Sequence, residues 1–368
     1  MRKRLWIIVL AALAMLAGCQ RRPLENIYAT TVRVIVKCLW TVEAYPEGVK
    51  PSGVTMYFFR DGEYYTTITT ANVDSCTVQL PEGRYKMYMI TQSPEEYWKM
   101  QFDHMTDFAN ASTSLRTTVA TWATRGSGEE VVENPEILCA GVSDEFEITA
   151  KMTEDYQYYY SYLKKMMAAS GAGTKAGDDD ITYYKERVEY YTIRIPVAPK
   201  NIVSQMWVSI YAKNADVLKS VRASNSGMAR TFELTQNTTG GEEAIQIINQ
   251  WKLTMDDEVN RIGHIDGIIT TFGLPNGETP SAKRDSTLNV SALLIDDKTQ
   301  ADYVFNTGDK IKQIAPNPGY RAMYRLIFGT VENPVIELPD VIPPDGKASG
   351  MDATVEDWEE GETVEIPM

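Results

Sequence analysis

Alternating apolar and polar positions characterise several segments in the first part of the chain. In Thr31–Trp40 an apolar side chain stands at every second position. This period is typical of a strand that buries one face, so the segment predicts a half-buried strand. Val54–Arg60 and Tyr64–Thr70 predict two further strands. Asp61-Gly62 between them predicts a hairpin turn, because glycine readily adopts a positive φ.

The pattern changes after Ser93. A hydroxyl residue followed by Pro94 and two acidic residues is a favourable start for a helix. Large apolar residues then follow at helical spacing, which predicts a helix that packs on the sheet. The strands predicted around it are Cys76–Leu80, Arg84–Ile90, Thr118–Thr124 and Glu136–Ala150. Residues 27–150 are therefore expected to form one β-rich domain.

Residues 151–190 lack the period-two pattern and are rich in tyrosine and glycine. We expect a connecting or surface loop here, with a short helix before it. The alternative is a tyrosine-rich contact surface, because tyrosine offers a large contact area at a low entropic cost. Tyr158, Tyr159 and Tyr160 are the candidate partner contacts in that case.

A second β-rich domain is expected over residues 191–340. Its predicted strands are Tyr191–Val197, Val203–Ala212, Ala229–Leu234, Asp266–Gly273, Thr287–Asp296 and Ala301–Thr307. Glu242–Trp251 fits either a short helix or a strand. Many short strands with turn signals between them favour sandwiches over alternating α/β units.

The N-terminus has the pattern of an export signal. Three basic residues precede an unbroken apolar run, Leu5–Leu16, which is too short to span a bilayer. Leu16, Ala17, Gly18 and Cys19 then resemble the bacterial lipobox. Residues 1–18 are predicted to be a lipoprotein signal peptide, and residues 19–26 a tether. Acyl chains on Cys19 would hold the protein to a membrane, because each buried methylene group contributes about 0.8 kcal/mol.

The C-terminal segment, residues 341–368, combines a proline-rich connector with an acidic stretch. Its last apolar residues alternate with polar ones, which favours an extended strand with one packed face. Trp358, Val364 and Ile366 are the predicted packing residues of this strand. The alternative is a disordered acidic tail, because like charges repel and chain ends fray.

Charge and chemistry narrow the possible functions. The net charge is −14 with scattered basic residues, which argues against a nucleic-acid partner. Only two histidines occur, His104 and His264, and neither lies in a recognisable catalytic motif. We therefore predict no enzyme activity, no catalytic residues, no metal and no cofactor. Cys38, Cys76 and Cys139 are expected to be small buried hydrophobic residues, with a Cys38–Cys76 disulfide as the alternative.

Several motifs in a fixed order resemble one family. After the lipobox come Arg22-Pro23-Leu24, the strand ending in Trp40, and LPEGRYKMYMI at Leu80–Ile90. Further motifs are ILCAGVSDEFEI at Ile137–Ile148, SNSGMA at Ser224–Ala229, TTFGLP at Thr270–Pro275 and VEDWEEGETVEIPM at Val355–Met368. The chain is similar to a Bacteroides lipoprotein family of the FimB/Mfa-type fimbrillin-like superfamily. The resemblance implies a mostly β fold, with two tandem transthyretin-like β-sandwich domains and short helical insertions. It also implies a role at the cell surface or in fimbriae.

These observations lead to one hypothesis and two alternatives. The chain is expected to be a lipid-anchored protein of the cell outer membrane, facing either the surface or the periplasm. It would act in adhesion or fimbrial assembly through fimbrial subunits or surface ligands. The first alternative is a surface glycan-binding lipoprotein that stacks sugar rings on tryptophans such as Trp98, Trp122, Trp207 and Trp251. The second is a hydrolase that uses two carboxylates across a cleft.

Overall fold

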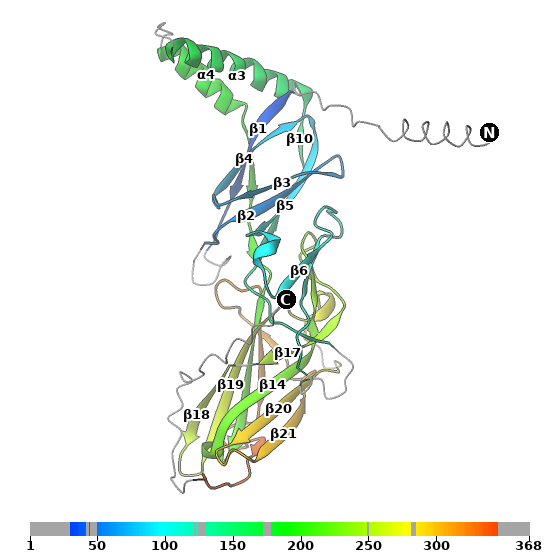
Figure 1. Cartoon of the computed structure of the whole chain (residues 1–368), viewed down its shortest axis with the longest axis vertical. Helices are drawn as coiled ribbons and strands as arrows, with labels where there is room; N and C mark the ends of the chain where they lie inside the picture. The colour runs from blue at the N-terminus through cyan, green and yellow to red at the C-terminus, as the bar shows by residue number, and fades with distance from the viewer. Residues whose placement is uncertain are drawn as a thin grey trace, which may run out of the picture. The chain divides into compact units, whose positions relative to one another are not determined.

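A computed structural model describes residues 30–41, 44, 50–120, 123, 130–171, 178–248, 250–280 and 285–344. Most elements are strands, and two α-helices follow one another near the middle of the chain (Figure 1). The mostly β character expected from the alternating pattern is confirmed. None of the helices among these residues combines the length and apolar character needed to cross a bilayer.

Two sheets contain the strands that the sequence predicts near the start of the chain. One has the order β11-β1-β4, with β11 at Ile193–Val197, β1 at Thr31–Cys38 and β4 at Ser75–Pro81. The other has the order β12-β9-β5-β2-β3, and β10 pairs with β5. Its strands are β2 Val54–Arg60, β3 Glu63–Thr70, β5 Gly83–Thr91, β9 Cys139–Val142, β10 Phe146–Ile148 and β12 Lys200–Asn201. The β2–β3 hairpin turns at Asp61-Gly62, as predicted, and Gly62 has a φ of 89°.

Two further sheets share one hydrophobic core, and we call them the two larger sheets because they contain the longest strands. The first has the order β18-β19-β13-β23-β22, with β24 also paired to β13. Its strands are β13 Ser204–Lys213, β18 Trp251–Asp257, β19 Ile262–Thr271, β22 Lys312–Ile314, β23 Met323–Phe328 and β24 Ile336–Glu337. The second has the order β21-β20-β14-β17-β8. Its strands are β8 Val131–Val132, β14 Leu218–Ala229, β17 Glu243–Ile248, β20 Thr287–Leu294 and β21 Gln300–Asn306.

Alternating residues from both of these sheets form the core between them. Val208, Ile265 and Leu326 come from one sheet, and Ala223 and Val290 from the other, and all are at most 2% exposed. The burial pattern of β19 alternates along its whole length. The sequence of Glu242–Trp251 fits either a short helix or a strand, and this segment forms strand β17.

A fifth sheet contains part of the segment that was predicted to be a helix. The residues after Ser93 form only a three-residue 3-10 turn, Pro94–Glu96, and the chain then enters β6, Met100–Asp103. This strand belongs to a sheet of order β16-β15-β7-β6, with β7 Ser112–Leu115, β15 Thr231–Glu233 and β16 Thr238–Thr239. The helix prediction was wrong because Met100 and Phe102 also fit period two, and the pairing with β7 decides between the two patterns. The strand predicted over Thr118–Thr124 is not formed by its described residues, 118–120 and 123.

Two helices occupy the segment that was expected to be mainly a loop. α3 spans Ala150–Gly171 and has 22 residues, and α4 spans Asp178–Tyr190. The sequence predicted one short helix before a loop, and the structure instead has two longer helices. Tyrosine favours strands intrinsically, but its spacing here places apolar faces on two helices that pack together. With most of β1 and β4 and all of β10, this helical hairpin forms one compact unit, and most other strands form a second.

Candidate functional site

The helical hairpin begins at a capped end. The Thr149 hydroxyl accepts a hydrogen bond from the Met152 backbone N–H at 3.3 Å, which satisfies one of the free donors of the first turn. One face of α3 is buried through Thr153, Tyr156 and Leu163, which are 0%, 1% and 8% exposed. The Gln157 amide donates to the Thr31 carbonyl at 2.7 Å. These contacts fix α3 against the start of β1.

Ring contacts link six tyrosines of α3, α4 and the position after α4, and we call them the tyrosine cluster: Tyr158, Tyr159, Tyr162, Tyr183, Tyr184 and Tyr191. Tyr162 stacks on Tyr184 with centroids 5.5 Å apart and planes inclined by 8°. Tyr159 stacks on Tyr191 at 5.3 Å. Such pairs contribute roughly 0.5–1.5 kcal/mol beyond the burial of their area. The cluster therefore holds the helical hairpin together as well as forming part of its surface.

Two cations lie beside rings of the tyrosine cluster. The Arg187 guanidinium lies 5.8 Å from the ring centre of Tyr159 and 5.4 Å from that of Tyr183. The Lys165 ammonium lies 5.2 Å from the ring centre of Tyr162. A hydrogen bond to the Tyr183 side chain raises the pKa of Arg187 further above its usual value. The neighbouring Tyr162 raises the pKa of Tyr158 above its usual value, which favours the neutral phenol at position 158.

The three predicted contact tyrosines do not share one face. Tyr158 is 55% exposed, whereas Tyr159 is half-buried against α4. Tyr160 is also half-buried and stacks on the buried Tyr156 at 5.5 Å. Consecutive helical residues point about 100° apart, so three in a row cannot form a single patch. Their role as partner contacts stays a prediction, and the exposed position is Tyr158.

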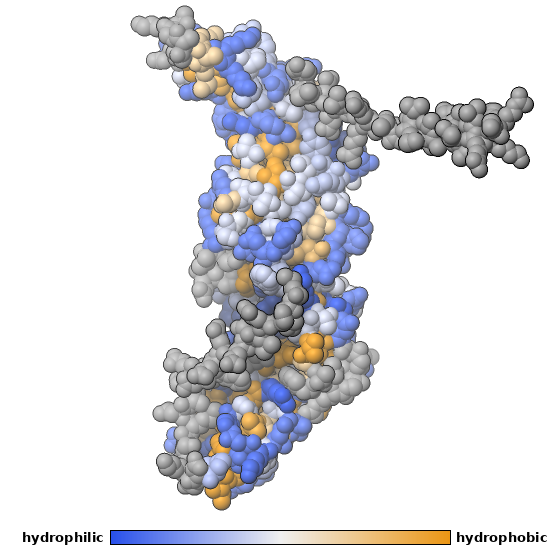
Figure 2. Space-filling model, in the orientation of Figure 1, coloured by the Kyte–Doolittle hydropathy of each residue, from blue (hydrophilic) through white to orange (hydrophobic). Residues whose placement is uncertain are grey.

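Two further exposed tyrosines come from α4, and the sequence interpretation did not include them among the candidate contacts. Tyr183 and Tyr190 are 46% and 73% exposed. The available signal was that residues 178–190 contain no proline or glycine, so a second helix was possible. On the face shown in Figure 2, hydrophilic and pale residues cover most of the helical hairpin, with a small hydrophobic area near its end.

His264 has two acidic neighbours but lacks the arrangement of a hydrolytic triad. Its Nδ1 lies 2.7 Å from Asp256 and its Nε2 lies 3.3 Å from Asp266. The Ser209 hydroxyl, on the paired strand β13, donates to Asp266 at 2.5 Å. The serine is therefore bonded to a carboxylate, whereas a nucleophilic serine needs the imidazole as its base. Among the described residues, no group of three or more His, Cys, Asp or Glu side chains is arranged to hold a metal ion.

The tryptophans named for sugar stacking have different environments. Trp98 is 83% exposed and Trp207 is 39% exposed. Trp251 lies in the core, where its indole N–H donates to the Ile248 carbonyl at 2.8 Å. Trp122 lies outside the described residues.

The three described cysteines are free and buried. The Cys38–Cys76 disulfide is therefore not formed in this structure, in agreement with the simpler expectation of small buried side chains. Burial raises the pKa of Cys38 to about 11 and that of Cys139 to about 12. Both thiols are protonated and unreactive near neutral pH.

Two sets of predicted residues lie outside the described residues. They are the signal and lipidation positions Leu16, Ala17, Gly18 and Cys19, and the C-terminal packing positions Trp358, Val364 and Ile366.

A family model decides where the chain belongs. The model for a domain of unknown function, DUF5119, matches residues 18–249, which is more than half of the 368 residues. The chain belongs to the DUF5119 family. No curated protein sequence matches this DUF5119 chain.

Solved structures resemble the DUF5119 chain at low sequence identity. A candidate adhesin from Bacteroides ovatus has a TM-score of 0.52 and 14% identity, over 89% of this chain and 99% of that one. The fimbrial anchor protein Mfa2 from Porphyromonas gingivalis has a TM-score of 0.45 and 12% identity, over 81% and 90% of the two chains. The tip fimbrial protein Mfa3 from the same organism has a TM-score of 0.34 and 9% identity, over 78% and 84%. The first similarity shows that the DUF5119 chain has the fold of that candidate adhesin.

Proposed function

We propose that the DUF5119 chain is a fimbrillin-like lipoprotein, held to the outer membrane through acylated Cys19. It acts in cell-surface adhesion or fimbrial assembly, as an anchor, accessory or tip subunit. The observation that supports this most is the shared fold with the Bacteroides ovatus candidate adhesin, which extends over nearly the full length of both chains. Two tandem transthyretin-like sandwiches are part of the same proposal.

Protein–protein contact is the mode of action in this proposal, and the helical hairpin offers a surface for it. Tyr158 and Tyr183 are each about half exposed, and the Arg187 cation lies beside Tyr183. Tyrosine and arginine are enriched at protein interfaces, because they bury large areas and also form polar contacts. The helical hairpin is therefore the part of the molecule where we place a partner.

A photo-cross-linking experiment in cells tests this proposal. A photoreactive amino acid replaces Tyr158 in the full chain, and the matched control replaces Tyr64 on β3, which is 43% exposed. We expect irradiation to link position 158, and not position 64, to a fimbrial subunit or another cell-surface protein. Equal products at both positions, or none at position 158, would contradict a partner on the helical hairpin.

A further inference from the structure

A pocket in the second compact unit is lined by positively charged side chains. It has a volume of about 590 Å³, within the roughly 300–1,000 Å³ typical of small-molecule sites. Its described lining residues include two cations, Lys200 and Arg321, and no aspartate or glutamate. The whole chain carries a net charge of −14, so a pocket with this lining stands out against its surroundings.

Arg321 lines the pocket and has hydrogen-bonding capacity left over. Its Nη2 donates to the Asn237 backbone carbonyl at 2.9 Å, and its guanidinium lies 4.7 Å from the ring centre of Phe232. The Nη1 atom is buried and has no hydrogen-bond partner. In the described part of the chain, no carboxylate forms an ion pair with Arg321. Burial lowers the pKa of this guanidinium below its usual value, yet the group stays charged at neutral pH.

The backbone around Arg321 is firmly placed. Asn317 and Pro318 begin a turn that Gly319 continues with a φ of 82°, as the third residue of a type II turn requires. The buried Asn201 side chain donates to the Gly319 carbonyl. The Arg321 backbone N–H donates to the Val203 carbonyl at 2.8 Å. The unpartnered nitrogen is therefore held in place by the fold.

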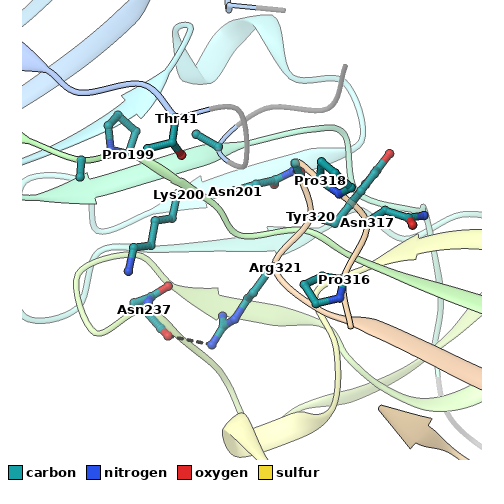
Figure 3. Close-up of a pocket in the computed structure, with 13 residues that line it drawn as sticks. Thr41, Pro199, Lys200, Asn201, Asn237, Pro316, Asn317, Pro318, Tyr320 and Arg321 are labelled. Carbon is teal, nitrogen blue, oxygen red and sulfur yellow. Dashed lines mark hydrogen bonds between the residues drawn. The ribbon is translucent and has the colours of Figure 1, made fainter. Parts of the chain in front are cut away.

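Among the remaining lining residues, which include several prolines and alanines, the polar side chains suit hydroxyl groups. Figure 3 shows the side chains of Lys200 and Arg321 extending towards Asn237, with Asn317 and Tyr320 from the neighbouring loop. Amide side chains both donate and accept hydrogen bonds, as a polyhydroxylated ligand needs. A guanidinium binds a planar carboxylate or a sulfate through two parallel hydrogen bonds.

We propose that this pocket binds a saccharide that carries an oxyanion group, either a carboxylate or a sulfate. The oxyanion pairs with Arg321 Nη1 and the Lys200 ammonium, and the sugar hydroxyls contact the side chains of Asn237 and Asn317. The volume is larger than a bare anion fills, which favours an acidic sugar over a simple ion. This proposal does not depend on lipid anchoring or on a partner at the helical hairpin.

Calorimetric titration of the detergent-purified full chain tests the pocket. The probes are glucuronic acid, glucose 6-sulfate, glucose and acetate. We expect at least one of the two acidic sugars to bind, and glucose to bind at least about ten-fold more weakly, because a charged hydrogen bond contributes more than a neutral one. The acidic sugar that binds identifies the oxyanion. Acetate binding as tightly as the acidic sugars, or no binding by either of them, would overturn the proposal.

Variants separate a specific pocket from a general charge effect. Arg321→Gln and Arg321→Lys each remove the two-pronged donor, and Lys200→Gln removes the exposed second cation. We expect about a ten-fold loss for the first two and a smaller loss for the third. Lys252→Gln, on an exposed position of β18 outside the pocket, is the matched control. Lys200→Gln keeps the test valid if an Arg321 variant fails to fold. Equal losses for Lys200→Gln and Lys252→Gln would refute the pocket.

Discussion

The core between the two larger sheets and the α3–α4 helical hairpin are stabilised in different ways. The core consists mainly of aliphatic residues such as Val208 and Leu326, which are at most 1% exposed. The helical hairpin is joined by half-exposed tyrosines that stack and also contact cations. A side chain that only fills a core has no surface left for a partner, whereas a half-exposed ring serves both packing and recognition. The difference identifies the helical hairpin as the region suited to interaction.

The largest effect is expected from a deletion in the aliphatic core. Leu326→Ala removes three carbons from a fully buried position on β23. We expect a loss of about 3 kcal/mol in the free energy of unfolding, because transfer and cavity terms add. Chemical denaturation followed by circular dichroism measures it. A loss below about 1 kcal/mol would show that this site is not tightly packed.

A glycine in the same core provides a second test. A Cβ on Gly267 of β19 would lie 2.8 Å from both the Trp251 ring and the Ile248 side chain. Gly267→Ala should therefore cost about 1–3 kcal/mol, as overpacking does elsewhere. Thermal denaturation should show a lower Tm. An unchanged Tm would mean that Trp251 moves aside without strain.

Within the helical hairpin, Tyr162→Ala should have a smaller effect on stability. It removes the stack on Tyr184 and the contact with Lys165, for an expected loss of about 1–2 kcal/mol. In this variant the circular dichroism signal of the helices at 222 nm should be lost at a lower temperature than the signal of the sheets. The control is Tyr190→Ala, because Tyr190 is 73% exposed and its loss should leave the helix signal unchanged. If both variants lost the helix signal at the same temperature, the packed and the exposed tyrosine would contribute equally to stability, which would contradict this account.

The smallest effect concerns the buried thiols and alkaline pH. Burial raises the pKa of Cys38 from 9.0 to about 11, so the folded state favours the protonated thiol. This contribution is fully present below pH 9.0 and is lost as the pH rises to about 11. We expect Cys38→Ala to show a shallower loss of stability over that interval than the unaltered chain. Parallel curves would contradict a raised thiol pKa.

The sequence predicts local strands well because alternation reports directly on burial. β1 and the β2–β3 hairpin lie where their patterns and the Asp61-Gly62 turn indicate. Pairings between distant segments leave no such local signal, and the parallel pairing of β13 with β23 is an example. The α3–α4 helical hairpin was missed because tyrosine favours strands and the glycine-rich stretch favours a loop.

The candidate sites were predictable only in part. Tyr158 was recognised from its tyrosine-rich surroundings, whereas the tyrosines of α4 were not chosen as contacts because the segment was expected to be a loop. Lys200, Asn237 and Arg321 lie far apart in the sequence and meet only when three segments fold together. A scattered pattern of single basic residues therefore gave no indication of a basic pocket.

The most direct test of the proposed function uses cells that lack this chain. Surface fimbriae are counted by electron microscopy and adhesion to a coated surface is measured, before and after restoring the full chain. The account predicts that deletion reduces fimbriae or adhesion, that the full chain restores them, and that a Tyr158→Ser, Tyr183→Ser double variant restores them incompletely. Unchanged fimbriae and unchanged adhesion after deletion would contradict a role in adhesion or fimbrial assembly.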